Sequence, residues 1–476
     1  MGVSAKGDLF PFCRVRKKKG GFFTMKRNVF LLLCSMLWLG AFAQVYNITS
    51  YGAKGNGKTL NTEAINRAVQ DCADNGGGTV LVPKGVFVTG TIVLKSNVHL
   101  YLEKGAELRA TTVLSHYTDY KPTKDMHKYG MAYFPNWTRG LIVATKQHNI
   151  SVTGLGLING MHVEDPNGEE GKRGPHTIVF GECSDFEISG ITIDKASNYA
   201  FVGYECKNAT FHNITITEGW DGIHIRGGEN VIIHDCKMYT GDDAIAGGFW
   251  NGVSISNCYL NTACNGIRVI FPASNLEIGN CTFQGPGLYP QRSTFDGKRR
   301  NMLAAIIIQP GGWDYSPGPS DNIYIHDITI DQMNGAVNFF LNRDNSASNV
   351  LVERVKATNI VLAGLSAESW NGGMFNKVTF SDIDVQFKGS ENQEWANKVL
   401  SETSIESRSM PYWGFYGKNI GELTLKNVNL SYTDKEIRPA IGLENVAQTT
   451  LENVTTQAVP GVDSMVVKQC GKITHK

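Results

Sequence analysis

The 476-residue sequence is poor in the features that divide a chain into separate domains. It contains only 15 prolines, and no linker, low-complexity tract or charge block interrupts it after residue 45. One continuous domain is therefore expected rather than several joined globules. The apolar run Val29–Leu39 is too short to cross a bilayer as a helix, so no membrane span is predicted.

The signatures of several reaction and binding classes are also missing. No Cys or His pairs have zinc spacing, no serine sits in a strand-to-helix elbow, and no phosphate-binding loop is present. We therefore predict no metal site and no cofactor. Without the first 43 residues, 37 basic and 43 acidic side chains remain, which gives a net charge of −6. A mildly acidic protein has no electrostatic basis for binding nucleic acid.

The first 43 residues have the pattern of a secretory signal. Lys26 and Arg27 precede the apolar run Val29–Leu39, and the small-residue site Ala41-Phe42-Ala43 follows it. Met25 is thus a better start than Met1, and Gln44 is the first expected mature residue. We predict an extension and signal over residues 1–43, one domain over residues 44–476, and a secreted or periplasmic location.

A repeat of about 22 residues is the most informative feature that is present. Asp221, Asp243 and Asn265 are each 22 residues apart, and each opens a similar phrase. A chain that repeats at this period winds, so that each turn lays a strand on the preceding one. Several strands fit into that interval, whereas a strand–helix unit does not. The sequence therefore predicts an all-β fold, a single-domain right-handed parallel β-helix, and a monomer.

A short helix is expected near the start of this coil. Asn61 is a candidate N-cap, and Ile65, Ala68, Val69 and Cys72 follow at the i, i+3, i+4 and i+7 spacing of one helical face. Placed there, the helix would cover the open end of the β-helix.

Cysteines follow the same period as the strands. Cys236, Cys258 and Cys281 are 22 and 23 residues apart, which is typical of a small apolar residue in a repeating core slot. We predict that these three are unpaired core thiols, although export would permit disulfides. The state of the other five stays open: Cys72, Cys183, Cys206, Cys264 and Cys470.

Strand alternation places polar residues on the outer face of the repeat. The isoleucines of the three aligned phrases point inward, so the residues after them point outward as one row. This row consists of His224, Ala246 and Arg268. It predicts a groove with polar walls, at whose edge Asp221 and Asp243 stand.

Three carboxylates on two neighbouring turns indicate catalysis. Asp at a strand entrance commonly only caps a turn, but Asn would serve that purpose without the repulsion among Asp221, Asp242 and Asp243. That repulsion raises the proton affinity of at least one of them, which suits a general acid, while the others orient and deprotonate water. Hydrolysis of a glycosidic bond needs such an acid and base.

These phrases carry a resemblance to a known family. Gly219–Ile223 and Gly241–Ile245 resemble the acid motifs of glycoside hydrolase family 28, the polygalacturonases, and residues 46–57 and 77–85 resemble the family's N-terminal region. The resemblance implies an inverting hydrolase in which Asp242 is the general acid. It also implies that Asp221 and Asp243 hold the attacking water.

The sequence departs from the family pattern at two places. Asn265 replaces the histidine of the family's Gly-His-Gly motif, and Ile307 and Gln309 stand where the family has the Arg and Lys that bind the substrate carboxylate. The sugar in that subsite is then either uncharged or bound by Arg268. Other candidate cations lie in the insertion before Met302: Arg292, Lys298, Arg299 and Arg300. The predicted substrate-binding residues are Asn265, Arg268, His224 and Trp250.

Aromatic residues and long loops point to a walled groove. Rings at strand ends or in Gly-rich loops are candidates for stacking on sugars: Trp220, Phe249, Trp250, Trp313, Tyr315, Trp370, Tyr412 and Trp413. Loops around residues 284–302 and 310–321 would close one end of the groove and favour exo action.

We therefore expect a secreted glycosidase that acts on a pectic or related polysaccharide or oligosaccharide, on galacturonic acid or rhamnogalacturonan-type chains. A β-helix polysaccharide lyase, with Arg268 as base, and a noncatalytic carbohydrate-binding protein are the alternatives.

Overall fold

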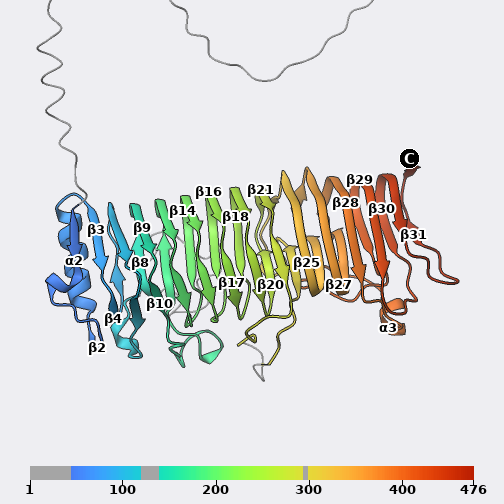
Figure 1. The fold of residues 1–476 in the computed structure, drawn as a ribbon. Coiled ribbons are helices and arrows are strands. Elements are labelled where there is room, and N and C mark those ends of the chain that lie inside the picture. The colour runs from blue at the N-terminus through green and yellow to red at the C-terminus, as the bar shows by residue number, and fades with distance from the viewer. Residues whose placement is uncertain (1–43, 120–138, 293–297) are drawn as a thin grey trace, which may run out of the picture. The chain divides into compact units, whose positions relative to one another are not determined.

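The computed structural model describes residues 44–119, 139–292 and 298–476 (Figure 1). Within residues 44–476, short strands stack in parallel, each on the equivalent strand of the turn before. This is a right-handed parallel β-helix, so the predicted fold class is confirmed. The proposed signal and its boundary with the domain involve residues 1–43, which lie outside the described residues.

The described chain contains two α-helices, α2 (Thr62–Asp74) and α3 (Gln393–Ala396). The strands of the N-terminal part are β1 (Val45–Asn47), β2 (Asn56–Leu60), β3 (Gly78–Val82), β4 (Gly85–Thr89), β5 (Ile92–Val93), β6 (Val98–Leu102), β7 (Ala106–Ala110), β8 (Gly140–Thr145), β9 (His148–Gly154), β10 (Leu157–Asn159), β11 (His176–Gly181), β12 (Ser184–Ser189) and β13 (Thr192–Asp194). The central strands are β14 (Phe201–His212), β15 (Thr215–Thr217), β16 (Ile223–His234), β17 (Lys237–Thr240), β18 (Ile245–Ser256), β19 (Tyr259–Thr262), β20 (Asn265–Val269), β21 (Ala273–Gly279), β22 (Thr282–Gln284), β23 (Ala304–Ile308) and β24 (Gly318–Pro319). The C-terminal strands are β25 (Ile323–Leu341), β26 (Asn345–Ala347), β27 (Val350–Ser369), β28 (Met374–Phe387), β29 (Phe415–Tyr432), β30 (Ile441–Thr456), β31 (Met465–Lys468) and β32 (Lys472–His475).

The 22-residue period of the sequence sets the register in which the strands of neighbouring turns pair. Ile223 on β16 pairs with Ile245 on β18, and Ile245 pairs with Ile267 on β20. All three side chains are buried in the core, as strand alternation predicts. The same register brings the segments that begin with Asp221 and Asp243 onto neighbouring turns.

Asparagines stabilise the bends of the coil. Asn230 and Asn275 adopt left-handed backbone conformations, with φ of 54° and 53°, which Asn tolerates better than most residues. Their side chains also bond along the stack, since Asn230 Nδ2 donates to Asn208 Oδ1 at 3.2 Å and Asn275 Nδ2 donates to Asn251 Oδ1 at 2.7 Å. These asparagines therefore mark bends inside β16 and β21.

Helix α2 covers the N-terminal end of the coil (Figure 1). It contacts β1, β3, β5 and β6, and its predicted apolar face is buried. Asn61 is the N-cap residue of α2, as predicted, but its side chain makes no capping hydrogen bond. The Asn61 side chain instead accepts a hydrogen bond from Lys54 N at 2.7 Å and donates to Thr59 O at 2.7 Å, so it fastens the preceding loop.

The cysteines of the described chain are all unpaired. Cys236, Cys258 and Cys281 are buried in the core, which confirms the prediction for these three. Of the five whose state was open, Cys470 is half-buried and the others are buried.

Candidate active site

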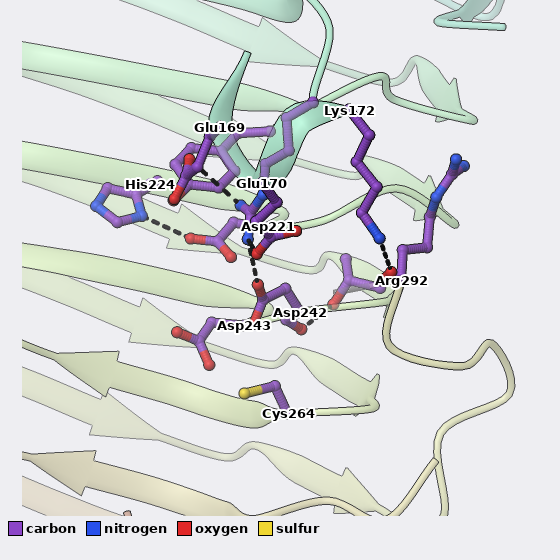
Figure 2. A network of polar contacts seen from close by, with 12 residues as sticks. Glu169, Glu170, Lys172, Asp221, His224, Asp242, Asp243, Cys264 and Arg292 are labelled. Carbon is purple, nitrogen blue, oxygen red and sulfur yellow. Dashed lines mark hydrogen bonds and ion pairs between the residues drawn. The ribbon is translucent and has the colours of Figure 1, made fainter. Parts of the chain in front are cut away.

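A pocket of about 410 Å³ opens on the outer face of the coil, beside the starts of β16 and β18. Five of the seven predicted site residues line it, and they are listed here: Asp221, His224, Asp242, Asp243 and Arg268. Figure 2 shows Asp221, Asp242 and Asp243 converging from neighbouring turns. The structure thus brings together the three carboxylates that the sequence singled out.

Asp221 is held by a chain of two hydrogen bonds. Arg226 Nε donates to His224 Nε2 at 2.9 Å, which leaves the His224 proton on Nδ1, 2.6 Å from Asp221 Oδ2 (Figure 2). Burial and the Arg226 charge hold the pKa of His224 well below its usual range, so the ring is neutral. The ring also stacks on Tyr199, with centroids 4.9 Å apart. His224 therefore donates to Asp221 and orients it.

Asp243 faces several donors at once. Its Oδ1 accepts hydrogen bonds from Asn265 Nδ2 at 2.8 Å and from Asn265 N at 3.1 Å, and its Oδ2 lies 3.4 Å from Arg268 Nη1. Asn265 and Arg268 thus hold the Asp243 side chain in place.

Asp242 has a weaker set of partners. Its Oδ2 lies 3.5 Å from Arg173 Nη2, the limit of a hydrogen bond. Burial and the Asp243 charge raise the pKa of Asp242 to about 6, although Arg173 acts in the opposite direction. Burial and the two other carboxylates also raise the pKa of Asp221 well above its usual range, and the Arg173 and Arg268 charges act in the opposite direction. Asp221 and Asp242 therefore both hold a proton more readily than an exposed carboxyl group. Because Asp221 also accepts a hydrogen bond from His224, Asp242 is the one that we expect to act as the acid.

Arg173 and its neighbours come from a segment for which the sequence offered no signal. The loop between β10 and β11 brings Glu169, Glu170 and Arg173 to the pocket. Arg173 Nη2 contacts Glu170 Oε1 at 2.7 Å, and its guanidinium lies over the Trp220 ring at 5.2 Å. Because the loop lies outside the strand repeat, periodicity could not place it.

Arg268 is buried and bound by neighbouring groups. With the Gln309 amide oxygen turned toward it, this oxygen accepts from Arg268 Nε at 2.8 Å and from Nη2 at 3.0 Å. Arg268 Nη2 also donates to Ile405 O at 3.1 Å, and the guanidinium lies 5.2 Å from the Trp313 ring centre. Gln309 stands at the position where the family pattern has Lys. Its side chain accepts hydrogen bonds from Arg268.

Two predicted substrate-binding residues lie elsewhere. Asn265 is fully buried behind Asp243 and does not line the pocket, so its contact is with the carboxylate rather than with a ligand. Trp250 is 3% exposed in the core, and its Nε1 donates to Ile225 O at 2.8 Å. Simple alternation from Ile245 would point Trp250 outward, but the left-handed conformation of Phe249 (φ 52°) shifts the alternation by one residue.

The predicted loops both reach the pocket, the first through Gln291 and the second through Trp313 and Asp314. Of the candidate aromatics, Trp313 is 57% exposed and lines the pocket, whereas Trp220, Trp370, Tyr412 and Trp413 are buried. The insertion cations do not line it within the described residues. Arg292 instead packs over Trp220 at 4.7 Å (Figure 2 shows its position).

One group of potential metal ligands lies in the site. Asp242, Asp243 and Cys264 each offer a ligand atom, all within 4.8 Å of one another (Figure 2). The group combines two hard carboxylate oxygens with one soft sulfur. Burial and the two aspartates also raise the pKa of the Cys264 thiol, which keeps it protonated. The prediction that the site works without a metal remains a prediction.

Comparison with known proteins relates this fold and site to one family. A family profile described as Rhamnogalacturonase A/epimerase, pectate lyase-like, matches residues 45–268. An exopolygalacturonase from Zea mays is 26% identical over 386 residues, which cover 74% of this chain and 86% of the relative. By sequence, the chain is thus distantly similar to the polygalacturonases.

Solved structures of the family share the β-helix. The family 28 exopolygalacturonase of Yersinia enterocolitica matches with a TM-score of 0.55 at 14% identity, covering 90% of this chain and 78% of that one. The exopolygalacturonase of Thermotoga maritima matches with a TM-score of 0.51 at 17% identity, covering 87% and 92%. The curated relatives indicate that the chain is a glycoside hydrolase, and the solved structures show that it shares their fold. None of its described helices is long and apolar enough to cross a membrane.

Proposed function

We propose that this protein is a secreted, exo-acting hydrolase that removes a terminal α-linked sugar from a pectic chain with inversion at the anomeric carbon. The observation that carries the proposal is the unequal environment of three adjacent carboxyl groups. His224 bonds to Asp221, and Asn265 and Arg268 face Asp243, whereas Asp242 faces Arg173 at 3.5 Å and the Cys264 thiol. One acid and two carboxylates are the set that single-displacement hydrolysis requires.

In the proposed reaction, Asp242 acts as the general acid. Its proton passes to the glycosidic oxygen as the bond from this oxygen to the anomeric carbon breaks. Asp221 and Asp243 hold a water molecule on the opposite face of the sugar, and one of them takes the proton that the water loses. The water oxygen forms the new bond to the anomeric carbon, so the configuration inverts.

Exo action is supported by the loops around the pocket. Four separate connections contribute to the pocket lining. They are the segment before β11 with Arg173, the β22–β23 connection with Gln291, the β23–β24 connection with Trp313, and the segment before β29 with Glu406. A pocket enclosed on several sides fits the end of a chain better than its middle. The names of the Zea mays, Yersinia and Thermotoga proteins agree with this mode.

A lyase mechanism has less support. A β-eliminating lyase needs a basic Arg or Lys, and Arg268 is engaged by Asp243, Gln309 and Ile405. Desolvation alone would lower the pKa of Arg268, but its acidic neighbours, Asp243 first among them, together outweigh this effect, and the pKa is raised. Absorbance near 235 nm from an unsaturated product is the readout for this alternative.

Two measurements test the proposal. Time-resolved proton NMR of the first product from a pectic oligosaccharide should show the anomer opposite to the substrate linkage, since one displacement inverts the centre. Asp242→Asn should lower turnover by about 100-fold or more, as expected for loss of a general acid. Circular dichroism should show the fold unchanged.

The same substitution at Asp221 or Asp243 should also lower turnover, because each is expected to orient the water. Asp235→Asn, on an exposed turn, is the matched control and should keep full activity. Retention of configuration, or near-normal turnover of Asp242→Asn, would contradict the assigned roles. Binding without turnover in the wild-type protein would favour a noncatalytic carbohydrate-binding role.

A further inference from the structure

The pocket has an excess of negative charge. Its described lining contains seven carboxyl groups: Glu169, Glu170, Asp221, Asp242, Asp243, Asp314 and Glu406. It contains three guanidinium groups: Arg173, Arg226 and Arg268. Carboxylates therefore outnumber cations by three even when Asp242 holds a proton. A ligand carboxylate that enters the pocket is repelled by these groups unless one of the three guanidinium groups turns toward it.

Arg173 is committed to carboxylates of the protein. Its Nη2 lies 2.7 Å from Glu170 and 3.5 Å from Asp242, and its Nη1 lies 3.8 Å from Glu169. The side chain is only 6% exposed. If Arg173 turned to a ligand carboxylate, these acidic groups would lose their counter-charge.

Arg226 and Arg268 are committed as well. Arg226 Nε donates to His224, and this bond sets the tautomer that holds Asp221. Arg268 contacts Asp243 through Nη1 and bonds to Gln309 and Ile405 through Nε and Nη2. Ile307 and Gln309 occupy the positions where the family pattern has Arg and Lys, so neither supplies a positive charge beside Arg268. Ile307 pairs with Arg268 on the neighbouring strand and is fully buried.

We propose that the sugar bound against the three aspartates is uncharged, a neutral hexose or deoxyhexose rather than a uronic acid. The inference rests on the proposed function for the place of that sugar, but not on whether the bond is cleaved. Arg268 is then a positioning residue for Asp243 and does not receive a substrate carboxylate. The polymer itself is still pectic, with the neutral unit at its end.

The test uses two ligands of equal length that differ in one charge. The first is a short galacturonate oligomer, and the second is the same oligomer with the terminal carboxyl reduced to a primary alcohol. Both are titrated calorimetrically into the Asp242→Asn variant, which keeps the shape of the site and cannot protonate the leaving group. The reduced oligomer should bind about 100-fold more tightly at low salt, and the gap should narrow as salt screens the repulsion.

Arg268→Gln separates the two roles of Arg268. As a positioning residue, it should affect the binding of both oligomers equally at high salt, where the lost positive charge is screened, and should there lower kcat on any cleaved substrate without changing the ratio of the two KM values. Arg67→Gln, on the exposed side of α2, is the matched control and should change neither ligand's affinity. Equal or tighter binding of the carboxylate-ended oligomer, lost selectively in Arg268→Gln, would overturn the inference.

Failure of the inference can be told from failure of the proposed function. If wild-type protein cleaves only the carboxylate-ended oligomer, the hydrolase assignment stands and the neutral subsite is wrong. If the reduced oligomer binds tightly but is not cleaved, the neutral subsite stands and the hydrolase role fails. If neither oligomer binds at millimolar concentration, the neutral subsite is also rejected.

Discussion

At the residue scale, Asp242 and Arg173 form the pair that sets the working pH. The raised pKa of Asp242, about 6, keeps its acid form populated below that pH, so the proposed general acid is lost as pH rises through about 6. The falling limb of kcat/KM against pH should therefore lie near pH 6. A profile that stays flat between pH 5 and 8 would contradict this assignment.

Arg173→Gln should move that limb. The Arg173 charge lies 3.5 Å from Asp242 and lowers its pKa, so its removal should raise the pKa and shift the alkaline limb upward by about one pH unit. Arg173→Lys should move the limb less, since the charge remains. An unmoved limb with lower activity would indicate that Arg173 only supports the loop.

At the element scale, the turn inside β18 decides which aromatic residues meet solvent. Gly247 has φ of 133°, and a Cβ there would lie 1.8 Å from Ile225 O, so only glycine fits. Phe249 then takes φ of 52°, which turns Trp250 into the core. Of the candidate aromatics, Trp313 on a separate loop therefore lines the pocket, together with Tyr199 and Phe271.

Trp250→Ala should destabilise the fold rather than weaken substrate binding. Removing a buried Trp typically costs about 3–5 kcal/mol in the free energy of unfolding, because a cavity is left. Thermal melts should show a lowered Tm, while KM of the folded fraction stays unchanged. Trp313→Ala is the matched comparison, since its 57% exposed ring should affect KM and leave Tm unchanged. A raised KM with normal Tm in Trp250→Ala would restore the ligand-binding role.

At the scale of the whole molecule, the open ends of the coil are the places where a β-helix can self-associate. Strands at an uncovered end present unpaired backbone groups and apolar core to other molecules. Helix α2 covers the N-terminal end through Ile65, Val69 and Cys72, which are essentially fully buried (Figure 1).

Val69→Asp should therefore uncover this end. A buried unpaired carboxylate is costly, so α2 should detach and the exposed end should promote self-association. Dynamic light scattering should show larger species and a lowered Tm. Glu63→Gln, on the exposed side of the same helix, should remain unaffected. A monodisperse Val69→Asp protein with unchanged Tm would show that the cap is dispensable.

The sequence by itself determined the parallel β-helix, its register and the meeting of Asp221, Asp242 and Asp243. The reason is that a fixed period makes the neighbour of each residue in space the residue about 22 positions along the chain. The stacking of Cys236, Cys258 and Cys281 in the core and the buried face of α2 follow from the same kind of local periodicity.

Tertiary structure alone decided what surrounds those carboxylates. Arg173 and Glu406 arrive on connections that have no period, so their places depend on packing over long sequence distances. The Asn61 side chain bonds to a loop instead of capping α2, and Trp250 points into the core, because a polar loop contact and one left-handed residue override the local pattern. The contact of Arg268 with Gln309 and Ile405 likewise joins separate turns of the coil, and only the folded chain shows that this cation is already engaged.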